Sequence, residues 1–372
     1  SSAVRRNVAA VTGETSRILS SFTLEVAEED GREIPLDGKW QFHLGDNPLW
    51  MSPSIDESDW TQLDPTKPLP DTLIAQIRAL EKKGIPAIGW LRVHLVIDKS
   101  LLNKPLAFGY EPWGASEVFV GPDKILTLGD LDKPGNQASV RKPNVSIPLV
   151  FTQENAVVSV RFHLGSADNL QSRPNQIFNA SIVPARTVAR IADSDRRELA
   201  FALCVFGVFL ALGMLHLILY LLLRKPVGNF YYAVFALLIA LASLLTYFES
   251  TTTNMRAYMR LDRIGWATIE IAFLFLISFL HTTFYGKLRS YHWALVAMTV
   301  AAVVSQFLPF PPWARLSFSL AMAVYLTEGF RVIVVSLWKK REGARIIGAG
   351  FIVAFGIFAD EAHERALRRF AT

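Results

Sequence analysis

Residues 201–223 read FALCVFGVFLALGMLHLILYLLL, an apolar run long enough to cross a bilayer as one α-helix. Four more apolar runs follow with short connectors, so we predict membrane spans at 199–223, 230–248, 266–284, 291–308 and 316–337. A sixth run, IIGAGFIVAFGIFA at 346–359, is shorter. All four tryptophans of this half lie at span ends, as an interfacial belt requires: Trp266, Trp293, Trp313 and Trp338. The pattern predicts a polytopic α-helical bundle over residues 199–360.

Charge gives the predicted orientation of this bundle. The chain has a formal net charge of +5, and the basic excess lies in residues 199–372, which hold 16 Lys and Arg against 8 Asp and Glu. Cytoplasmic loops collect Lys and Arg, so RKPVG, GKLRS and WKKREGAR are predicted to face the cytoplasm and the N-terminal half to lie outside. Because the chain begins with Ser1, we expect a signal peptide to have been cleaved.

The end of the chain conflicts with an even number of spans. Six spans would place ERALRRFAT outside, although its three arginines suit the inner face. We therefore expect a seventh span to be missing between about Asp360 and Glu361, with 361–372 as a juxtamembrane segment.

Residues 36–185 are predicted to form an antiparallel β domain. In WLRVHLVI (90–97) and VVSVRFHL (157–164), apolar residues alternate with polar or aromatic ones, which is typical of half-buried strands. Short strands are also expected at 105–109, 116–120, 145–151 and 177–183, and a helix at 71–83. This regular spacing favours a sandwich or jelly roll. Residues 1–35 are a peripheral segment, and 186–198 a polar, helical connector into the first span.

Several stretches resemble a known module. LDGKWQFHLGDNPLW (36–50), DESDW, GWLRVHLVID and EVFVGPDKI resemble the sugar-binding jelly roll at the front of family 2 glycosidases. With the membrane bundle behind it, the chain resembles bacterial seven-transmembrane receptors with diverse intracellular signalling modules. The resemblance implies a cytoplasmic output such as a serine phosphatase, a diguanylate cyclase or a histidine kinase, which this chain does not contain.

No constellation in the sequence predicts chemistry. GxSxG, HExxH and phosphate-binding glycine-rich motifs are absent, and the paired carboxylates of the glycosidases belong to a barrel domain that is not here. The single cysteine, Cys204, excludes a disulfide framework and a cysteine-ligated metal site. We expect no catalytic residue, metal or cofactor, and no nucleic-acid partner.

Two groups of residues are candidates for ligand binding. In FGYEPWGASE (108–117), the rings of Tyr110 and Trp113 would stack on a sugar, and Glu111 would accept hydrogen bonds from hydroxyl groups; alternatively, Trp113 caps the core. The second group shares one strand face and would contact an anionic or polar ligand: Arg92, His94, Arg161 and His163. Its alternative is a solvated face or an interdomain contact. We expect Trp40, Trp60 and Trp90 in the core.

Ionisable residues inside the predicted spans form a third group. Charges at depth are costly and normally face the bundle interior. Glu328 and Arg331 are spaced i,i+3 and can pair on one helical face. Together with His216 and Glu270 they form a predicted intramembrane polar switch, although Glu270 could instead lie at the interface.

These patterns predict a bacterial inner-membrane sensory receptor, expected to be a homodimer in contact with membrane lipid. Its periplasmic jelly roll would detect a carbohydrate-like ligand or a periplasmic protein, and the spans would signal to the effector. Two alternatives stay open. One is a carbohydrate-binding scaffold for polysaccharide export or cell-wall assembly, for which one anchor would suffice. The other is a membrane enzyme or a transporter, which often shows internal repeats that are not seen here.

Overall fold

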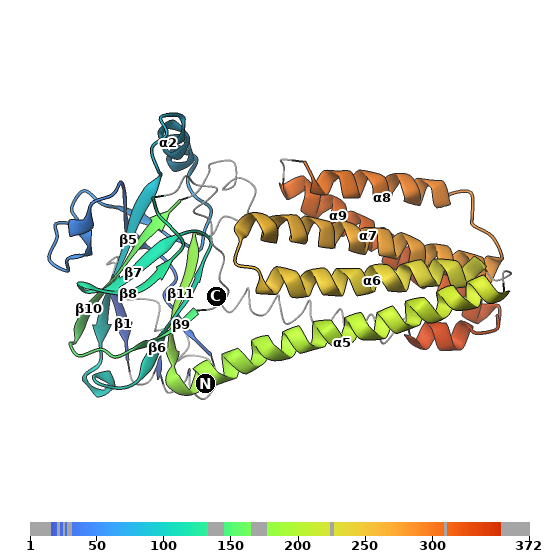
Figure 1. Cartoon of the computed structure of the whole chain (residues 1–372), viewed down its shortest axis with the longest axis horizontal. Helices are drawn as coiled ribbons and strands as arrows, with labels where there is room; N and C mark the ends of the chain where they lie inside the picture. Colours follow the sequence, from blue (N-terminus) through green and yellow to red (C-terminus); the bar gives the residue numbers. More distant parts are fainter. Residues whose placement is uncertain are drawn as a thin grey trace. The chain divides into compact units, whose positions relative to one another are not determined.

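The computed structural model describes residues 16–20, 23–24, 27, 32–132, 145–164, 177–223, 227–308 and 311–350. The chain divides into two compact units: Ser1–Ala192 with Thr253–Met255, and Asp193–Thr252 with Arg256–Thr372. Over the described residues, the first consists mainly of β-strands and the second of α-helices (Figure 1). This confirms the predicted fold class, a β-sandwich followed by a helical bundle.

The sandwich consists of two sheets. Over the described residues the larger sheet has the order β4-β3-β5-β10-β7-β8, with β1 paired to β5, and the smaller one the order β2-β11-β6-β9. All pairs are antiparallel except β1 with β5, which is parallel. The strands are β1 (Ser16–Leu19), β2 (Ile34–Pro35), β3 (Trp40–Leu44), β4 (Thr61–Leu63), β5 (Ile88–Ile97), β6 (Leu106–Pro112), β7 (Ser116–Val120), β8 (Asp123–Leu128), β9 (Val145–Leu149), β10 (Asn155–His163) and β11 (Phe178–Pro184). Helix α2 (Asp71–Lys82) lies in the β4–β5 connection, as predicted.

The two sheets enclose an apolar core built from the alternation seen in the sequence. On β5, Leu91, Val93 and Leu95 are at most 2% exposed, and they face this core. Trp40 meets Phe178 of the opposite sheet edge-on, with ring centroids 5.1 Å apart. The apolar face of each strand is therefore what holds the sandwich together.

The outer face of the larger sheet is also covered. Segment 45–60 crosses it and includes the short 3-10 helix η2 (Pro48–Met51). It brings Trp50, Met51 and Trp60 against Trp90 and Phe119 in a second apolar cluster. Strand β5 is consequently buried on both faces over its first half, whereas alternation predicted that only one face would be buried.

The second unit begins within α5 (Ala185–Leu223), a single helix that includes both the predicted connector and the first predicted span. The helices that follow are α6 (Val227–Thr251), α7 (Met255–Tyr285), α8 (His292–Gln306) and α9 (Pro311–Trp338). Among the described residues, four helices are long and apolar enough to cross a membrane: Ala185–Leu223, Val227–Thr251, Arg256–Tyr285 and Leu316–Trp338. Large apolar side chains of α5 such as Phe201 and Leu222 are exposed, at 62% and 76%. Such exposure suits a helix surrounded by lipid.

The predicted span 291–308 is shorter than expected. Helix α8 has 15 residues. At about 1.5 Å per residue it covers roughly 22 Å, less than the roughly 30 Å of a hydrocarbon core. The loop before Tyr291 and the prolines after Leu308 in the sequence limit its length. Residues 344–350, which include the start of the sixth apolar run, are helical. The described residues end there, so they do not include the rest of this run, the site of the expected seventh span or the segment 361–372.

Helices α5 and α6 approach closely at a glycine. A Cβ on Gly213 would lie 2.8 Å from Leu237 Cγ and 3.2 Å from the Leu237 backbone nitrogen. A Cβ on Gly207, six residues earlier in α5, would meet nothing within 4 Å. Small residues commonly let transmembrane helices approach in this way.

We expect Gly213→Ala to lower the stability of the bundle by about 1–3 kcal/mol, because overpacking forces neighbouring groups apart. Gly207→Ala should leave the stability of the bundle unchanged or raise it slightly, because alanine favours a helix and has room at this position. Thermal unfolding of both variants in detergent measures the difference. Equal melting temperatures would contradict the close approach of α5 and α6.

Candidate functional site

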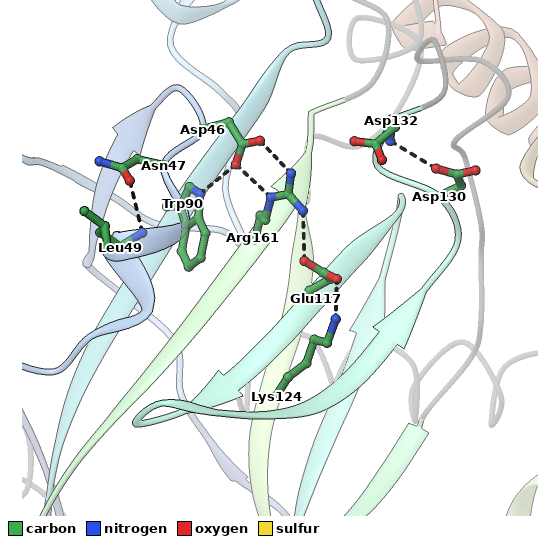
Figure 2. A network of polar contacts seen from close by, with 9 residues as sticks. All are labelled: Asp46, Asn47, Leu49, Trp90, Glu117, Lys124, Asp130, Asp132 and Arg161. Atoms are coloured by element: carbon green, nitrogen blue, oxygen red, sulfur yellow. Dashed lines mark hydrogen bonds and ion pairs between the residues drawn. The ribbon is translucent and has the colours of Figure 1, made fainter.

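A network of charges lies on the outer face of the larger sheet (Figure 2). Arg161 of β10 donates to Asp46 at 2.7 and 2.5 Å and to Glu117 of β7 at 2.9 Å. Asp46 also accepts a 3.3 Å hydrogen bond from Trp90 Nε1, and Glu117 pairs with Lys124 of β8 at 2.8 Å. The network therefore links the start of segment 45–60 to four neighbouring strands of the sheet, β5, β10, β7 and β8.

A second group of charges lies further along the same segment. Glu57 accepts a 2.7 Å hydrogen bond from Arg92 Nε, and its two oxygens lie 3.0 and 3.1 Å from His94 Nε2. Arg92 is completely buried; it also donates to the Trp50 carbonyl oxygen and to Ser159 Oγ, the latter at 3.3 Å. Burial of a guanidinium is tolerated when a carboxylate pairs with its charge, as Glu57 does here. Arg92 and Glu57 thus fix the middle of the segment to β5.

The carboxylates of both groups have lowered pKa values. The hydrogen bond from Arg161 holds the pKa of Asp46 below its usual value, against the opposing effect of burial. Burial alone would raise the pKa of Glu57, but its bonds to His94 and Arg92 outweigh this and lower it. Glu117 behaves in the same way, with Lys124 and Arg161 as its donors. All three side chains therefore carry negative charge at neutral pH.

The structure brings the predicted basic residues onto one face but does not leave them free for a ligand. Arg92 and Arg161 are engaged by carboxylates on the outer face of the larger sheet, and His163 is only 3% exposed, with a pKa that burial lowers. His94 keeps a third of its side-chain surface exposed while it contacts Glu57. Segment 45–60 covers much of this face, through Glu57 and through Trp50 and Trp60, which cluster with Trp90.

The predicted aromatic loop is also different in the structure. Residues up to Pro112 form β6 and residues from Ser116 form β7, so only a short connection remains. Tyr110 points between the sheets, is 1% exposed and packs against Phe108 and Phe178. Its expected stacking on a sugar is wrong, since an inward position on β6 buries the ring.

The other two residues of that loop keep part of their surface. Glu111 accepts a 3.1 Å hydrogen bond from Asn179 and is half-buried. Trp113 is also half-buried, and its backbone nitrogen donates to the Ile177 carbonyl at 3.0 Å. Of the predicted aromatic group, these two side chains are the ones that a ligand can still reach.

In the bundle, one carboxylate connects three helices. Glu328 of α9 pairs with Arg331 at 2.7 Å, the i,i+3 contact that the spacing predicted. Glu328 Oε1 also lies 2.8 Å from His281 Nε2 of α7 and accepts a 2.7 Å hydrogen bond from Tyr291, just before α8. Arg331 donates to the same tyrosine hydroxyl at 2.5 Å. These four residues are called the Glu328 cluster below.

The remaining intramembrane candidates have separate partners. Glu270 of α7 is fully buried and accepts a 3.2 Å hydrogen bond from Gln306 of α8, so its side chain faces the neighbouring helix. His216 of α5 contacts Asn229 of α6, with 3.1 Å between Nδ1 and Oδ1. The four predicted switch residues therefore occupy three places in the bundle and do not form one site.

Sequence reasoning missed the partners that complete these sites. Glu57, Asp46 and Glu117 are acidic residues in a connection or on a strand, and nothing in their local pattern pairs them with Arg92 or Arg161. His281 and Tyr291 were equally unnoticed, although an ionisable residue near a span end is a usable signal. Among the described residues, no three His, Cys, Asp or Glu side chains come together as a metal-binding group.

Comparison with known families identifies the membrane half. Residues 198–359 match the family model described as 7TM diverse intracellular signalling. This match confirms the predicted resemblance for the segment that it covers. The matched segment covers, wholly or in large part, the four described helices that are long and apolar enough to cross a membrane, so it resembles the membrane-embedded part of this signalling family. No curated protein matches the chain.

Solved structures resemble only parts of the chain. A β-glucuronidase from Ruminococcus gnavus is 11% identical over 35% of this chain and 21% of its own, with a TM-score of 0.26. A β-glucosidase from Kluyveromyces marxianus, solved with glucose, is 12% identical over 44% of this chain and 17% of its own, with a TM-score of 0.25. The chain thus matches about a fifth or less of either enzyme. Likeness at this level bears on neither activity nor ligand.

We expect acid to destabilise the sandwich through its paired carboxylates. Because their folded pKa values lie below the unfolded ones, the stabilisation is complete above pH of about 4.5 and is lost as pH falls through the folded values. Arg161→Gln should cost about 1–3 kcal/mol at neutral pH and make the acid dependence shallower, since Asp46 and Glu117 lose their shared donor. Thermal midpoints between neutral and acidic pH measure both effects. The exposed Lys104→Gln is the control, and an identical pH dependence in the Arg161 variant would refute the network's role.

Glu328→Gln should loosen the contact between α7 and α9 and lower bundle stability by about 1–2 kcal/mol. The amide keeps the shape of the side chain but removes the charge that Arg331 pairs with. Thr327→Val is the matched control, because Thr327 is exposed and its hydroxyl donates within α9 to the Ala323 carbonyl. Thermal unfolding in detergent compares the two. A loss as large in the Thr327 variant would argue against a special role for the carboxylate.

Proposed function

We propose that this chain is the sensing and membrane part of a bacterial inner-membrane receptor. Its β-sandwich lies outside the cytoplasm and detects a carbohydrate-like ligand or a periplasmic protein. The bundle passes the signal to a cytoplasmic effector. One observation carries the proposal: a segment matching the 7TM signalling family directly follows a β-sandwich in one chain.

The sandwich supports a sensor role through the side chains that remain accessible. Glu111 lies near the end of β6 and offers an oxygen acceptor, and Trp113 lies just beyond the strand and offers a flat ring. Such a pair can recognise a sugar or the surface of a protein. The charge networks around Arg92 and Arg161 then serve as the rigid support of this surface and not as its contacts.

The bundle supports a transmission role through the Glu328 cluster. One carboxylate holds groups from α7, from the start of α8 and from α9 itself, so a displacement of α9 must break or exchange hydrogen bonds that involve charged groups. Such bonds are strong and directional, and exchanging them gives two distinct arrangements. The cluster therefore provides the polar switch, with His281 and Tyr291 added to the predicted Glu328 and Arg331.

The distribution of basic residues supports the orientation. Lys287 and Arg289 precede α8, and Lys339, Lys340, Arg341 and Arg345 follow α9. Both groups lie at ends of helices that the proposal assigns to the cytoplasmic side, as the positive-inside rule requires. An effector attached beyond the bundle, a serine phosphatase, a diguanylate cyclase or a histidine kinase, would lie on that same side.

Labelling of introduced cysteines in whole cells tests the orientation on which the function depends. In a Cys204→Ala background, Asp123→Cys places a thiol at the exposed start of β8, and Lys287→Cys places one in the exposed loop before α8. A membrane-impermeant maleimide should modify the first in intact spheroplasts and the second only after permeabilisation. The opposite pattern would refute the receptor orientation.

A further inference from the structure

A basic hollow lies at the C-terminal end of α9. It has a volume of about 360 Å³ and is formed between the last residues of α9 and the helical turn that starts at Ala344. Lys340, Arg341 and Arg345 line it, against one acidic residue, Glu342. The lining therefore carries an excess of positive charge, and it follows a helix long enough to cross a membrane.

At the C-terminal end of α9, Lys340 occupies a backbone position where glycine is usual. Helix α9 ends in a Schellman motif: Lys340 N donates to the Leu337 carbonyl, and Arg341 N to the Ser336 carbonyl, both at 3.0 Å. Lys340 has φ +50°, the left-handed conformation that side chains other than glycine and asparagine rarely adopt. Three residues later the chain uses glycine for the same region, Gly343 at φ +73°. A strained residue of this kind points to a role for its side chain.

Arg341 anchors the wall of the hollow. Its guanidinium donates to the Phe284 carbonyl oxygen at the end of α7 and lies 4.7 Å from the centre of the Tyr285 ring. These contacts attach the segment after α9 to α7. They leave Lys340 and Arg345, both exposed, as the cations that a bound anion can reach.

The rim of the hollow is apolar and exposed. Leu337 and Ile346 belong to its lining and are 40% and 81% exposed, and Trp338, which follows Leu337 in α9, is 88% exposed. A tryptophan at the end of a membrane-length helix marks the level of the lipid headgroups. The place thus offers cations for a phosphate and, beside them, apolar surface for hydrocarbon. A soluble anion would use only the cations and not the apolar surface.

We propose that this hollow binds an anionic phospholipid of the phosphatidylglycerol type. Its phosphate lies between Lys340 and Arg345, and its acyl chains lie against Trp338 and Ile346. Juxtamembrane cations attract anionic lipid in this manner. The proposal goes beyond the receptor function and holds for either orientation of the chain, because it needs only that α9 ends at a bilayer surface.

Quenching of Trp338 by brominated lipid tests the site in the full chain. The protein is reconstituted in phosphatidylcholine bilayers that contain equal fractions of either dibromo-phosphatidylglycerol or dibromo-phosphatidylcholine. The signal of Trp338 is the difference between each protein and its Trp338→Phe partner. We expect the glycerol lipid to quench Trp338 more strongly, which gives its relative affinity for the site.

Lys340→Gly should lower that relative affinity about fivefold, and adding Arg345→Gln about 25-fold, as expected for removing one or two cations at a membrane surface. Lys340→Gly also relieves the left-handed conformation, so its thermal midpoint should be equal to or above that of the wild type. Arg260→Gln is the matched control: it removes an exposed cation near the other end of α7, and quenching should not change.

Three results would overturn the proposal. In the first, both brominated lipids quench wild-type Trp338 equally. In the second, the Lys340→Gly, Arg345→Gln protein is folded and keeps the full preference. In the third, soluble glycerol phosphate abolishes the preference, which would assign the hollow to a soluble phosphate compound and not to a lipid.

Discussion

A charge taken out of water must be paired, and this constraint organises both halves of the protein. In the sandwich, buried Arg92 pairs with Glu57 and donates to Ser159 and to the Trp50 carbonyl. In the bundle, Glu328 pairs with the nearby Arg331 and contacts His281 and Tyr291. Apart from the i,i+3 pair of Glu328 and Arg331, these contacts join segments that are distant in the sequence. The charged residues therefore act as connectors between elements, and this is their main structural effect.

The same constraint changes the description of the sensor. Arg92 and Arg161 seemed available for a ligand only while their carboxylate partners were unknown; once Glu57, Asp46 and Glu117 are placed, both guanidinium groups are occupied. Segment 45–60 is held on the sheet by these contacts and by the aromatic cluster of Trp50, Trp60, Trp90 and Phe119. In the sensor role that we propose, recognition would use the less buried residues near the end of β6, Glu111 and Trp113. A rigid sheet beneath them keeps their geometry fixed.

In the bundle, polar contacts are distributed along the helices. The contact between Glu270 and Gln306 joins the middle of α7 to the end of α8, whereas the Glu328 cluster includes His281, close to the end of α7. Just beyond that end, Arg341 joins the segment after α9 to Phe284. The basic hollow that we propose to bind a phospholipid is therefore attached to the end of α7 as well as to α9. Lipid composition and signal transmission would act on the same helix end.

The sequence by itself determined the parts of this protein that depend on periodicity. Alternation along WLRVHLVI and VVSVRFHL predicted β5 and β10 and their inward residues, and apolar runs predicted the long helices, because burial on one face or contact with lipid imposes a local pattern. The i,i+3 pair of Glu328 and Arg331 was predictable for the same reason. Only the tertiary structure decided that Tyr110 belongs to the core, that α8 is short, and that Glu57 and His281 complete the charged sites. These contacts join residues far apart in the chain, and no local period records which distant partner will satisfy a buried charge.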